Sequence, residues 1–220
     1  MLRLTRTANA GVLLELDGVK ILLDGVCREV SPYPATPESI KNKLRDSYPD
    51  LVAVTHCHED HCDPGFEGDY RAATGRQVID SSFAGKTVCC NNMSLTAVNS
   101  RHIGKADCDH VSFVIEGSLC IWFMGDASPN QWKNRGDLPK PDVLICPYAY
   151  ATTEPAWRIT RELSPKAVVL LHLPEREKDS FGLWQAVERV TAGSNLPKLL
   201  IPEIGDSVEN DKFTIEKDKC

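Results

Sequence analysis

The sequence has no apolar run long enough to cross a membrane. Its longest ones, such as residues 167–171, are far shorter than the roughly 20 residues that a transmembrane helix needs. Residues 1–6 alternate between apolar and polar side chains, as a strand does, and lack the apolar core of a signal peptide. We therefore expect a cytoplasmic protein with no membrane partner.

Cysteine pairs and an excess of positive charge are also missing. The nine cysteines form no Cys-x-x-Cys motif and are odd in number, so without an export signal we interpret them as reduced thiols. Lys and Arg number 25 against 31 Asp and Glu, a net charge of -6. Because nucleic-acid binders usually present a basic face, we expect no nucleic-acid partner.

Length and composition favour an ordinary globular protein. The 220 residues are enough for one domain with a real core, which we expect to span residues 1–220. Internal repeats and low-complexity tracts are absent. The sequence is compatible with a homo-oligomer but does not specify one.

Short β-rich segments recur along the chain. Residues 2–7, 12–16 and 19–23 predict an antiparallel meander, and the Asp17-Gly18 pair between the last two is a strong hairpin signal. Further strands are predicted over residues 51–55, 94–102, 110–116, 119–124, 142–146, 166–171 and 199–202. Weaker signals fall near Val78 and at residues 87–89.

Three helices are predicted between these strands. Thr36 as N-cap and Pro37 at the first helical position begin one, which would bury Ile40, Leu44 and Tyr48. A second covers residues 66–74 and ends at Gly75. A third covers residues 180–192 and would place one apolar stripe in the core: Phe181, Trp184, Val187 and Val190.

The segment from His56 to Asp63 is a metal site by composition. It follows a buried β-branched strand and contains three histidines and Asp60 within six positions. Imidazole nitrogen and carboxylate oxygen are ligands for zinc, manganese and iron(II). Residues two apart in an extended chain point to the same side, so His56 and His58 are expected to bind one ion, and Asp60 and His61 to face a second.

Three other polar residues follow apolar strands in the same manner. His102, Asp126 and His172 each come directly after or near the end of a strand-like run. A single strand-end histidine is usually only a boundary residue, but five of the six histidines occupy such places. Ligands at strand ends are held rigidly and remain open to solvent, so we expect these side chains to meet at one edge of the fold.

These residues resemble the metallo-β-lactamase superfamily. His56-Cys57-His58-Glu59-Asp60-His61 fits its His-x-His-x-Asp-His signature, and Gly125-Asp126 fits its strand-Gly-Asp element. The resemblance extends over about residues 2–205 and implies an α/β fold, a four-layer αββα sandwich with two mixed sheets flanked by helices. It also implies that His56, His58 and His102 bind one metal and Asp60, His61 and His172 a second, with Asp126 between them.

The implied activity is hydrolysis of a small-molecule substrate. Two divalent ions, zinc first and manganese or iron as alternatives, would share a hydroxide that attacks a small metabolite, either anionic or neutral, such as a lactone, phosphoester, ester or amide. Asp60 would also orient that hydroxide. Asp24 is expected to be a turn aspartate, although members of this family often have an aspartate close to the metals at this position. In its compact length and motif spacing, the chain resembles the stand-alone branch of the superfamily that includes the L-ascorbate 6-phosphate lactonase-like proteins.

Several assignments stay open at the level of sequence. His110 begins a strand and is expected to be a leaving-group acid, a partner of a metal ligand or a boundary residue. Tyr148 and Tyr150 are expected to polarise a substrate carbonyl or phosphate. Cys57 and Cys62 are expected to pack inertly, with metal ligation or oxidation as the alternative. Arg101 and Lys105 are expected to contact an anion or lie in solvent. Two other functions remain alternatives: an iron-containing redox or sensor protein and a non-catalytic metal-binding scaffold.

Overall fold

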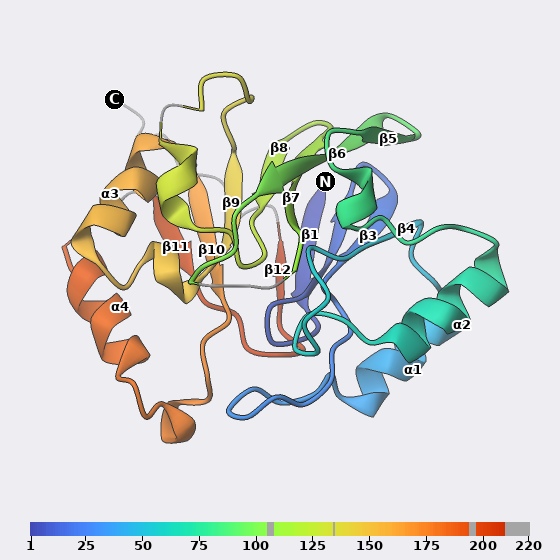
Figure 1. Cartoon of the computed structure of the whole chain (residues 1–220), viewed down its shortest axis with the longest axis horizontal. Coiled ribbons are helices and arrows are strands. Elements are labelled where there is room, and N and C mark those ends of the chain that lie inside the picture. The colour runs from blue at the N-terminus through green and yellow to red at the C-terminus, as the bar shows by residue number, and fades with distance from the viewer. Residues whose placement is uncertain (105–107, 134, 194–196, 210–220) are drawn as a thin grey trace.

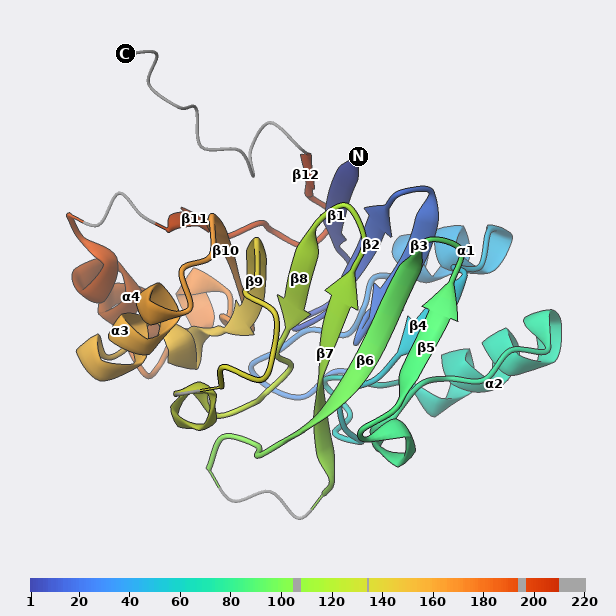
Figure 2. The same ribbon diagram turned by 90° about the horizontal axis from the view of Figure 1, so that it is seen from above.

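The protein folds into two β-sheets packed face to face, with helices on both outer sides (Figure 1). The computed structural model describes residues 1–104, 108–133, 135–193 and 197–209. Figure 2 shows the same four layers from above, with α1 and α2 beside one sheet and α3 and α4 beside the other. The predicted four-layer αββα architecture is confirmed.

The first sheet has five strands in the order β12-β1-β2-β3-β4. Their bounds are β1 (Leu2–Arg6), β2 (Val12–Leu16), β3 (Val19–Leu23), β4 (Leu51–Ala53) and β12 (Ser207–Glu209). The β1, β2 and β3 strands form the predicted antiparallel meander, and β4 pairs parallel to β3. Because they run parallel, β3 and β4 end at the same edge of the sheet. The histidine-rich segment begins at this edge, directly after β4.

The second sheet has seven strands in the order β11-β10-β9-β8-β7-β6-β5. Their bounds are β5 (Thr87–Cys90), β6 (Met93–Ser100), β7 (His110–Glu116), β8 (Cys120–Phe123), β9 (Val143–Pro147), β10 (Ala167–Leu171) and β11 (Lys198–Leu200). The four strands from β8 to β11 run parallel, and β5 to β8 pair antiparallel. The carboxyl ends of β8, β9 and β10 therefore meet at one edge.

Three apolar clusters hold the layers together. The largest lies between the sheets and contains side chains from both, including Leu14, Ile21, Phe113 and Ile145. A second lies between the larger sheet and the helices α3 (Glu154–Glu162) and α4 (Leu183–Thr191). The third joins the smaller sheet to α1 (Glu38–Asp46) and α2 (Pro64–Thr74). No helix among the described residues has the length and apolar character needed to cross a membrane.

The expected N-cap at Thr36 is wrong. The helix α1 begins at Glu38, Pro37 is its N-cap residue, and no side chain caps it. Thr36 is buried, and its hydroxyl accepts a hydrogen bond from the Cys27 backbone N–H at 2.9 Å. The Thr36 hydroxyl oxygen therefore bonds to Cys27 and does not cap the helix.

Other boundaries also differ from the predictions. The predicted helix over residues 180–192 begins only at Leu183, because Asp179 accepts hydrogen bonds from the Leu183 and Trp184 backbone N–H groups. Phe181 consequently lies outside the helix and is 79% exposed, so its assignment to the core is wrong. Near Val78 there is only an isolated bridge between Ala53 and Ile79. The short strand β12 was not predicted, and residues 210–220 lie outside the described part of the chain.

Candidate metal centre

All six histidines of the chain lie in one cluster at the edge where strands of both sheets end. The segment after β4 supplies His56, His58 and His61, the turn after β6 supplies His102, and the residue after β10 is His172. Their imidazole rings are linked by centroid distances from 4.1 to 5.2 Å, for example 4.8 Å between His56 and His102. The predicted convergence of distant segments is therefore present.

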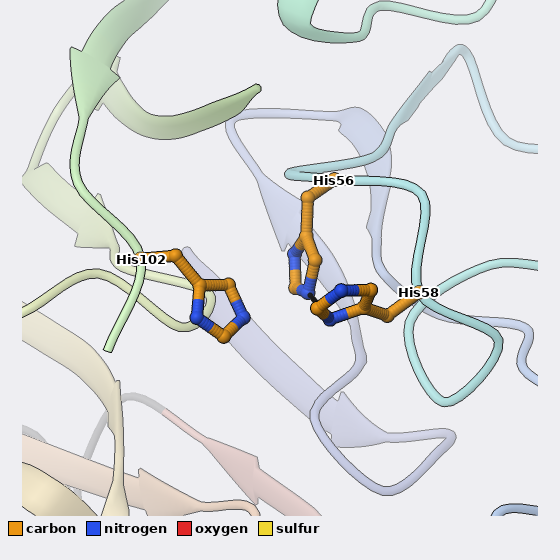
Figure 3. Close-up of side chains that lie close together, drawn as sticks. All are labelled: His56, His58 and His102. Carbon is orange, nitrogen blue, oxygen red and sulfur yellow. Dashed lines mark hydrogen bonds between the residues drawn. The ribbon is translucent and has the colours of Figure 1, made fainter. Parts of the chain in front are cut away.

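One group of possible ligands consists of His56, His58 and His102. One nitrogen from each lies within 4.8 Å of the other two. The His56 Nε2 and His58 Nδ1 atoms are 3.0 Å apart, and Figure 3 shows the ring of His102 facing this pair from the other side. Two nitrogens bound tetrahedrally to one zinc ion are about 3.3 Å apart, given zinc–nitrogen bonds of about 2.0 Å. The three rings have the spacing of a shared cation site.

A second group consists of Asp60, His61 and His172, again within 4.8 Å of one another. The Asp60 Oδ2 atom is 3.1 Å from His172 Nε2 and 3.8 Å from His61 Nε2. Asp126 lies between the groups: its Oδ2 is 3.5 Å from both His102 Nε2 and His172 Nε2, and its Oδ1 is 3.5 Å from His61 Nε2. A single carboxylate therefore faces ligands of both groups.

Asp24 orients histidines of both groups. Its fully buried carboxylate accepts hydrogen bonds from the Thr55 backbone N–H, from the Thr55 hydroxyl and from His61 Nδ1, at 2.7, 2.7 and 2.8 Å. Since the Thr55 proton goes to Asp24, His56 Nδ1 donates to Thr55 Oγ1 at 2.9 Å. The Nε2 atoms of His56 and His61 are thereby left for a cation, an arrangement that is common around ligand histidines.

Asp24, His56 and His61 also lie within 4.8 Å of one another. We do not treat this group as a third ion site, because the three hydrogen bonds already occupy both oxygens of Asp24. The sequence favoured an ordinary turn aspartate at position 24, and only the family resemblance placed it near the metals. The structure shows how one carboxylate fixes two imidazole rings.

His110 lies in the same cluster, with its ring centroid 5.0 Å from that of His56 and 5.6 Å from that of His102. Its Nε2 accepts a hydrogen bond from the Asp126 backbone N–H at 3.0 Å, and its Nδ1 is 2.7 Å from Ser100 Oγ. Burial lowers the pKa of His110 to about 3. Because both nitrogens are occupied and the ring is neutral, the geometry favours support of Asp126 over proton transfer to a leaving group.

Several polar atoms at the centre are buried without a hydrogen-bond partner. Within the described residues they include His61 Nε2, His102 Nε2, Asp126 Oδ1 and both ring nitrogens of His172. A buried polar atom without a partner costs about 1–3 kcal/mol. Divalent cations would satisfy these atoms together, so the donor set fits nitrogen- and oxygen-binding metal ions.

Electrostatic coupling within the cluster supports the same fit. Burial opposes the charged form of His61, yet the carboxylates of Asp126 and Asp24 outweigh burial and raise the pKa of His61 well above its ordinary value. Burial would raise the pKa of Asp126, but the neighbouring His172 and His61 hold it well below its usual range. The acidic groups therefore favour positive charge at the centre, which a metal ion would also supply.

Of the two predicted tyrosines, only Tyr148 lies beside His172. The prediction for Tyr150 is wrong, because its side chain is fully buried and its hydroxyl accepts a hydrogen bond from Trp132 Nε1. Tyr148 begins a short 3-10 helix after β9, and its ring centroid is 5.9 Å from that of His172. Tyr33, which the sequence analysis missed, lies closer, at 4.4 Å. Burial raises the pKa of both phenols, and the charge of Asp126 adds to the shift. Nothing in the local sequence of Tyr33 marks it, because the loop before α1 brings it to the site.

The remaining predicted residues divide between core and surface. Cys62 is buried in the cluster beneath α1 and α2, as expected, but Cys57 is exposed, so inert packing is wrong for that residue. The eight cysteines in the described ranges are all free thiols. Arg101 is exposed, and its backbone N–H donates to Gln131 Oε1. Lys105 lies outside the described residues.

Fold and centre together define a protein of the metallo-β-lactamase fold with a histidine- and aspartate-rich candidate metal site. Comparison with known families agrees. The family described as "Beta-lactamase superfamily domain" matches residues 3–172, which include every residue of the centre. The chain belongs to this superfamily.

Individual relatives resemble most of the chain. A UPF0173 metal-dependent hydrolase from Methanosarcina mazei is 27% identical in an alignment of 200 positions that covers 78% of this chain and 83% of the relative. Igni18, a metallo hydrolase from Ignicoccus hospitalis, is 21% identical with a TM-score of 0.66, covering 94% of this chain and 97% of that one. A possible metal-dependent hydrolase from Veillonella parvula is 17% identical with a TM-score of 0.68, covering 94% and 99%. The two solved structures support the fold.

Proposed function

We propose that the protein is a metal-dependent hydrolase with a dinuclear centre. His56, His58 and His102 would hold one divalent ion, and Asp60, His61 and His172 the other. The observation that supports this most directly is the position of Asp126, whose Oδ2 lies 3.5 Å from a histidine of each group. A carboxylate so placed can bridge two ions, and the relative from Methanosarcina mazei is named a metal-dependent hydrolase.

The ions, with zinc our first choice and manganese or iron as alternatives, would supply positive charge for the transition state and a shared hydroxide at neutral pH. The chain itself holds their ligands in place. Asp24 fixes the rings of His61 and, through Thr55, of His56. His110 accepts the Asp126 backbone N–H and so fixes the residue between the groups.

The loop between β1 and β2 contacts the second group of possible ligands, Asp60, His61 and His172. The Arg6 guanidinium donates to the backbone oxygens of Ala8, Asn9 and Pro202 at 3.1, 2.8 and 2.9 Å. The Asn9 side chain in turn lies 3.5 Å from Asp60 Oδ2, and the Asn9 backbone oxygen accepts from the His172 N–H. We propose that Asp60, held in this way, also orients the attacking oxygen.

The substrate we propose is a small metabolite with a hydrolysable lactone, ester, amide or phosphoester bond. We propose that the protein is most similar in function to the branch of the superfamily that contains the L-ascorbate 6-phosphate lactonase-like proteins. Pocket-lining loops differ between proteins that share a fold, so the fold does not select among these bonds. We propose no nucleic-acid or membrane partner.

Elemental analysis of protein purified without chelator tests the centre. We expect about two divalent ions per chain, as in other two-metal hydrolases. His102→Ala and His172→Ala should each retain about one ion, because each removes a ligand from a different group. The matched control is Asp69→Asn, a change on α2 in an exposed pair with Arg45, which should leave both ions bound.

Less than one ion per wild-type chain would contradict the proposal. Full occupancy without turnover on a panel of esters, lactones and phosphodiesters would instead favour a metal-binding scaffold. Iron content with an optical spectrum that changes on reduction would favour a redox or sensor protein.

A further inference from the structure

Two tyrosine rings from separate segments flank His172. The Tyr33 ring meets the imidazole edge-to-face, with an interplanar angle of 86° and a centroid distance of 4.4 Å. The Tyr148 ring does so at 73° and 5.9 Å. His172 Nε2 itself lies 3.1 Å from Asp60 and 3.5 Å from Asp126. Both rings therefore border the second group of the candidate metal centre.

The loop that presents Tyr33 is fixed by hydrogen bonds. Tyr33 N–H donates to Val30 O at 2.7 Å, and Val30 N–H donates to Tyr33 O at 3.1 Å. The Arg28 N–H donates to Glu59 O at 2.7 Å, which joins the loop directly to the histidine-rich segment. Tyr148 has a similarly fixed origin, since it follows the buried strand β9. Rigid supports of this kind are needed for a residue that must meet a substrate at a defined place.

The two phenol hydroxyls have no structural task of their own. In the described part of the chain, neither oxygen has a hydrogen-bond partner, although both side chains are half-buried. This contrasts with Tyr70 and Tyr150, whose hydroxyls bond to Asp50 O and Trp132 Nε1. Both half-buried donors are therefore free to bond an acceptor from outside the chain, beside the second candidate metal group.

Space for a ligand lies next to these residues along the chain. A cavity of about 640 Å³ has Pro34 and Leu173, the immediate neighbours of Tyr33 and His172, in its lining. Small-molecule sites typically have such volumes. The wall is polar as well as apolar, because it also contains the charged side chains Arg6, Glu175, Arg176, Glu177 and Glu203. A substrate bound by the two phenols has this space beside it for its remaining atoms.

We propose that Tyr33 and Tyr148 form a paired-donor subsite that binds an acceptor oxygen of the substrate, on a carboxyl or a phosphoryl group. The proposal rests on the proposed function, because the bound group would be the one that is hydrolysed. Each phenol donates one hydrogen bond to this oxygen, and the bonds strengthen as negative charge develops on it. Substrate binding then accounts for two hydroxyls that make no hydrogen bond within the described protein.

Anion binding to the metal-loaded protein tests the subsite without a known substrate. Inorganic phosphate and acetate are titrated calorimetrically into the wild type, Tyr33→Phe, Tyr148→Phe and a control, Tyr48→Phe. Tyr48 packs against Phe66 and Tyr70 beneath the helices, away from the centre. We expect Kd to rise about tenfold in each site variant, the loss of one hydrogen bond to a charged group, and to be unchanged in the control.

Two further measurements separate this subsite from the metal centre. Metal content and the thermal midpoint should match the wild type in both site variants, since phenylalanine keeps the ring contacts and the hydroxyls have no partners to lose. A larger effect on phosphate supports a phosphoryl group, and a larger effect on acetate a carboxyl group. Unchanged Kd values in both site variants, or no binding of either anion to the loaded wild type, would overturn the subsite. Failure of the hydrolase proposal would appear instead as missing metal in the wild type.

Discussion

The two ends of strand β3 have aspartates with the same unusual backbone and different partners. Asp17 precedes the strand with φ 51°, and Asp24 follows it with φ 46°. Asp17 accepts hydrogen bonds from the Ser118 backbone N–H and hydroxyl at 2.6 and 2.7 Å, joining hairpins of the two sheets. Asp24 accepts from Thr55 and His61 and so orients possible metal ligands.

The difference lies in what remains unsatisfied around each aspartate. At the Asp17 end, donors and acceptors of the two hairpins satisfy one another. At the Asp24 end, several buried nitrogens and an oxygen of Asp126 have no partner. Unpaired buried polar atoms destabilise a fold, and five of the nine such atoms in the described residues belong to His61, His102, Asp126 and His172, at the edge where a cation can satisfy them. At the opposite edge, the contacts of Asp17 join the two hairpins.

The largest effect is expected from Asp24→Asn. The new amide N–H₂ would face groups that now donate, so His61 would lose the acceptor that fixes its tautomer. We expect metal affinity to fall by about 10–100-fold and the free energy of unfolding of the metal-free protein by about 3 kcal/mol. Zinc titration and urea unfolding measure the two effects. Asp17→Asn is the matched control at the other end of β3, and a loss of zinc affinity there equal to that of Asp24→Asn would refute the comparison.

Gly125→Ala should have the next largest effect. Gly125 has φ 51°, and an added Cβ would lie 2.5 Å from Thr55 Oγ1 and 2.6 Å from its Cγ2. We expect a loss of about 2 kcal/mol in the free energy of unfolding together with weaker zinc binding, because Thr55 and Asp126 must move. Gly18→Ala, with φ 83° and open space around the Cβ, should cost about 1 kcal/mol from the backbone alone and leave zinc affinity unchanged. Equal zinc affinities in the two variants would contradict this account.

The smallest effect, and the one with a pH dependence, is that of Asp17→Asn on stability. Hydrogen bonds from the Ser118 backbone and then its side chain lower the pKa of Asp17. Its ionised form is therefore favoured in the native state, and this stability is present above the unfolded pKa of about 3.9 and lost as the pH falls through the lower native value. We expect a cost of about 1 kcal/mol at pH 7 that shrinks below about pH 4. Urea unfolding of metal-free protein at pH 7 and pH 3 checks this, and a cost independent of pH would count against it.

Much of the fold could be predicted from local pattern. The alternation of residues 12–16 and 19–23 around Asp17-Gly18 predicts the hairpin that the structure contains. The Gly75 C-cap and the buried Leu44 were also predicted correctly. Errors occurred where another hydrogen bond competed with the expected one. Thr36 bonds to Cys27, nine residues away, instead of capping α1. Asp179 accepts from the Leu183 N–H, a local contact, and delays the start of α4 until Leu183.

The candidate site divides in the same way. The spacing from His56 to His61 and the strand ends at His102, Asp126 and His172 predicted which residues would meet, and the structure brings them together. Their assignment as ligands of two ions stays a prediction. The contact between His110 and the Asp126 backbone, and the approach of Tyr33 to His172, have no signal in the sequence.

The sequence by itself determined most of the strands, the family and the set of side chains able to bind cations, because alternation and ligand spacing are properties of adjacent residues. Only the tertiary structure decided which oxygen supports which imidazole, which hydroxyls stay unpaired and how the loop with Tyr33 reaches the centre. Those outcomes depend on competition among groups that are far apart along the chain. Such competition is resolved only when the two sheets have packed and each buried donor has found, or failed to find, its acceptor.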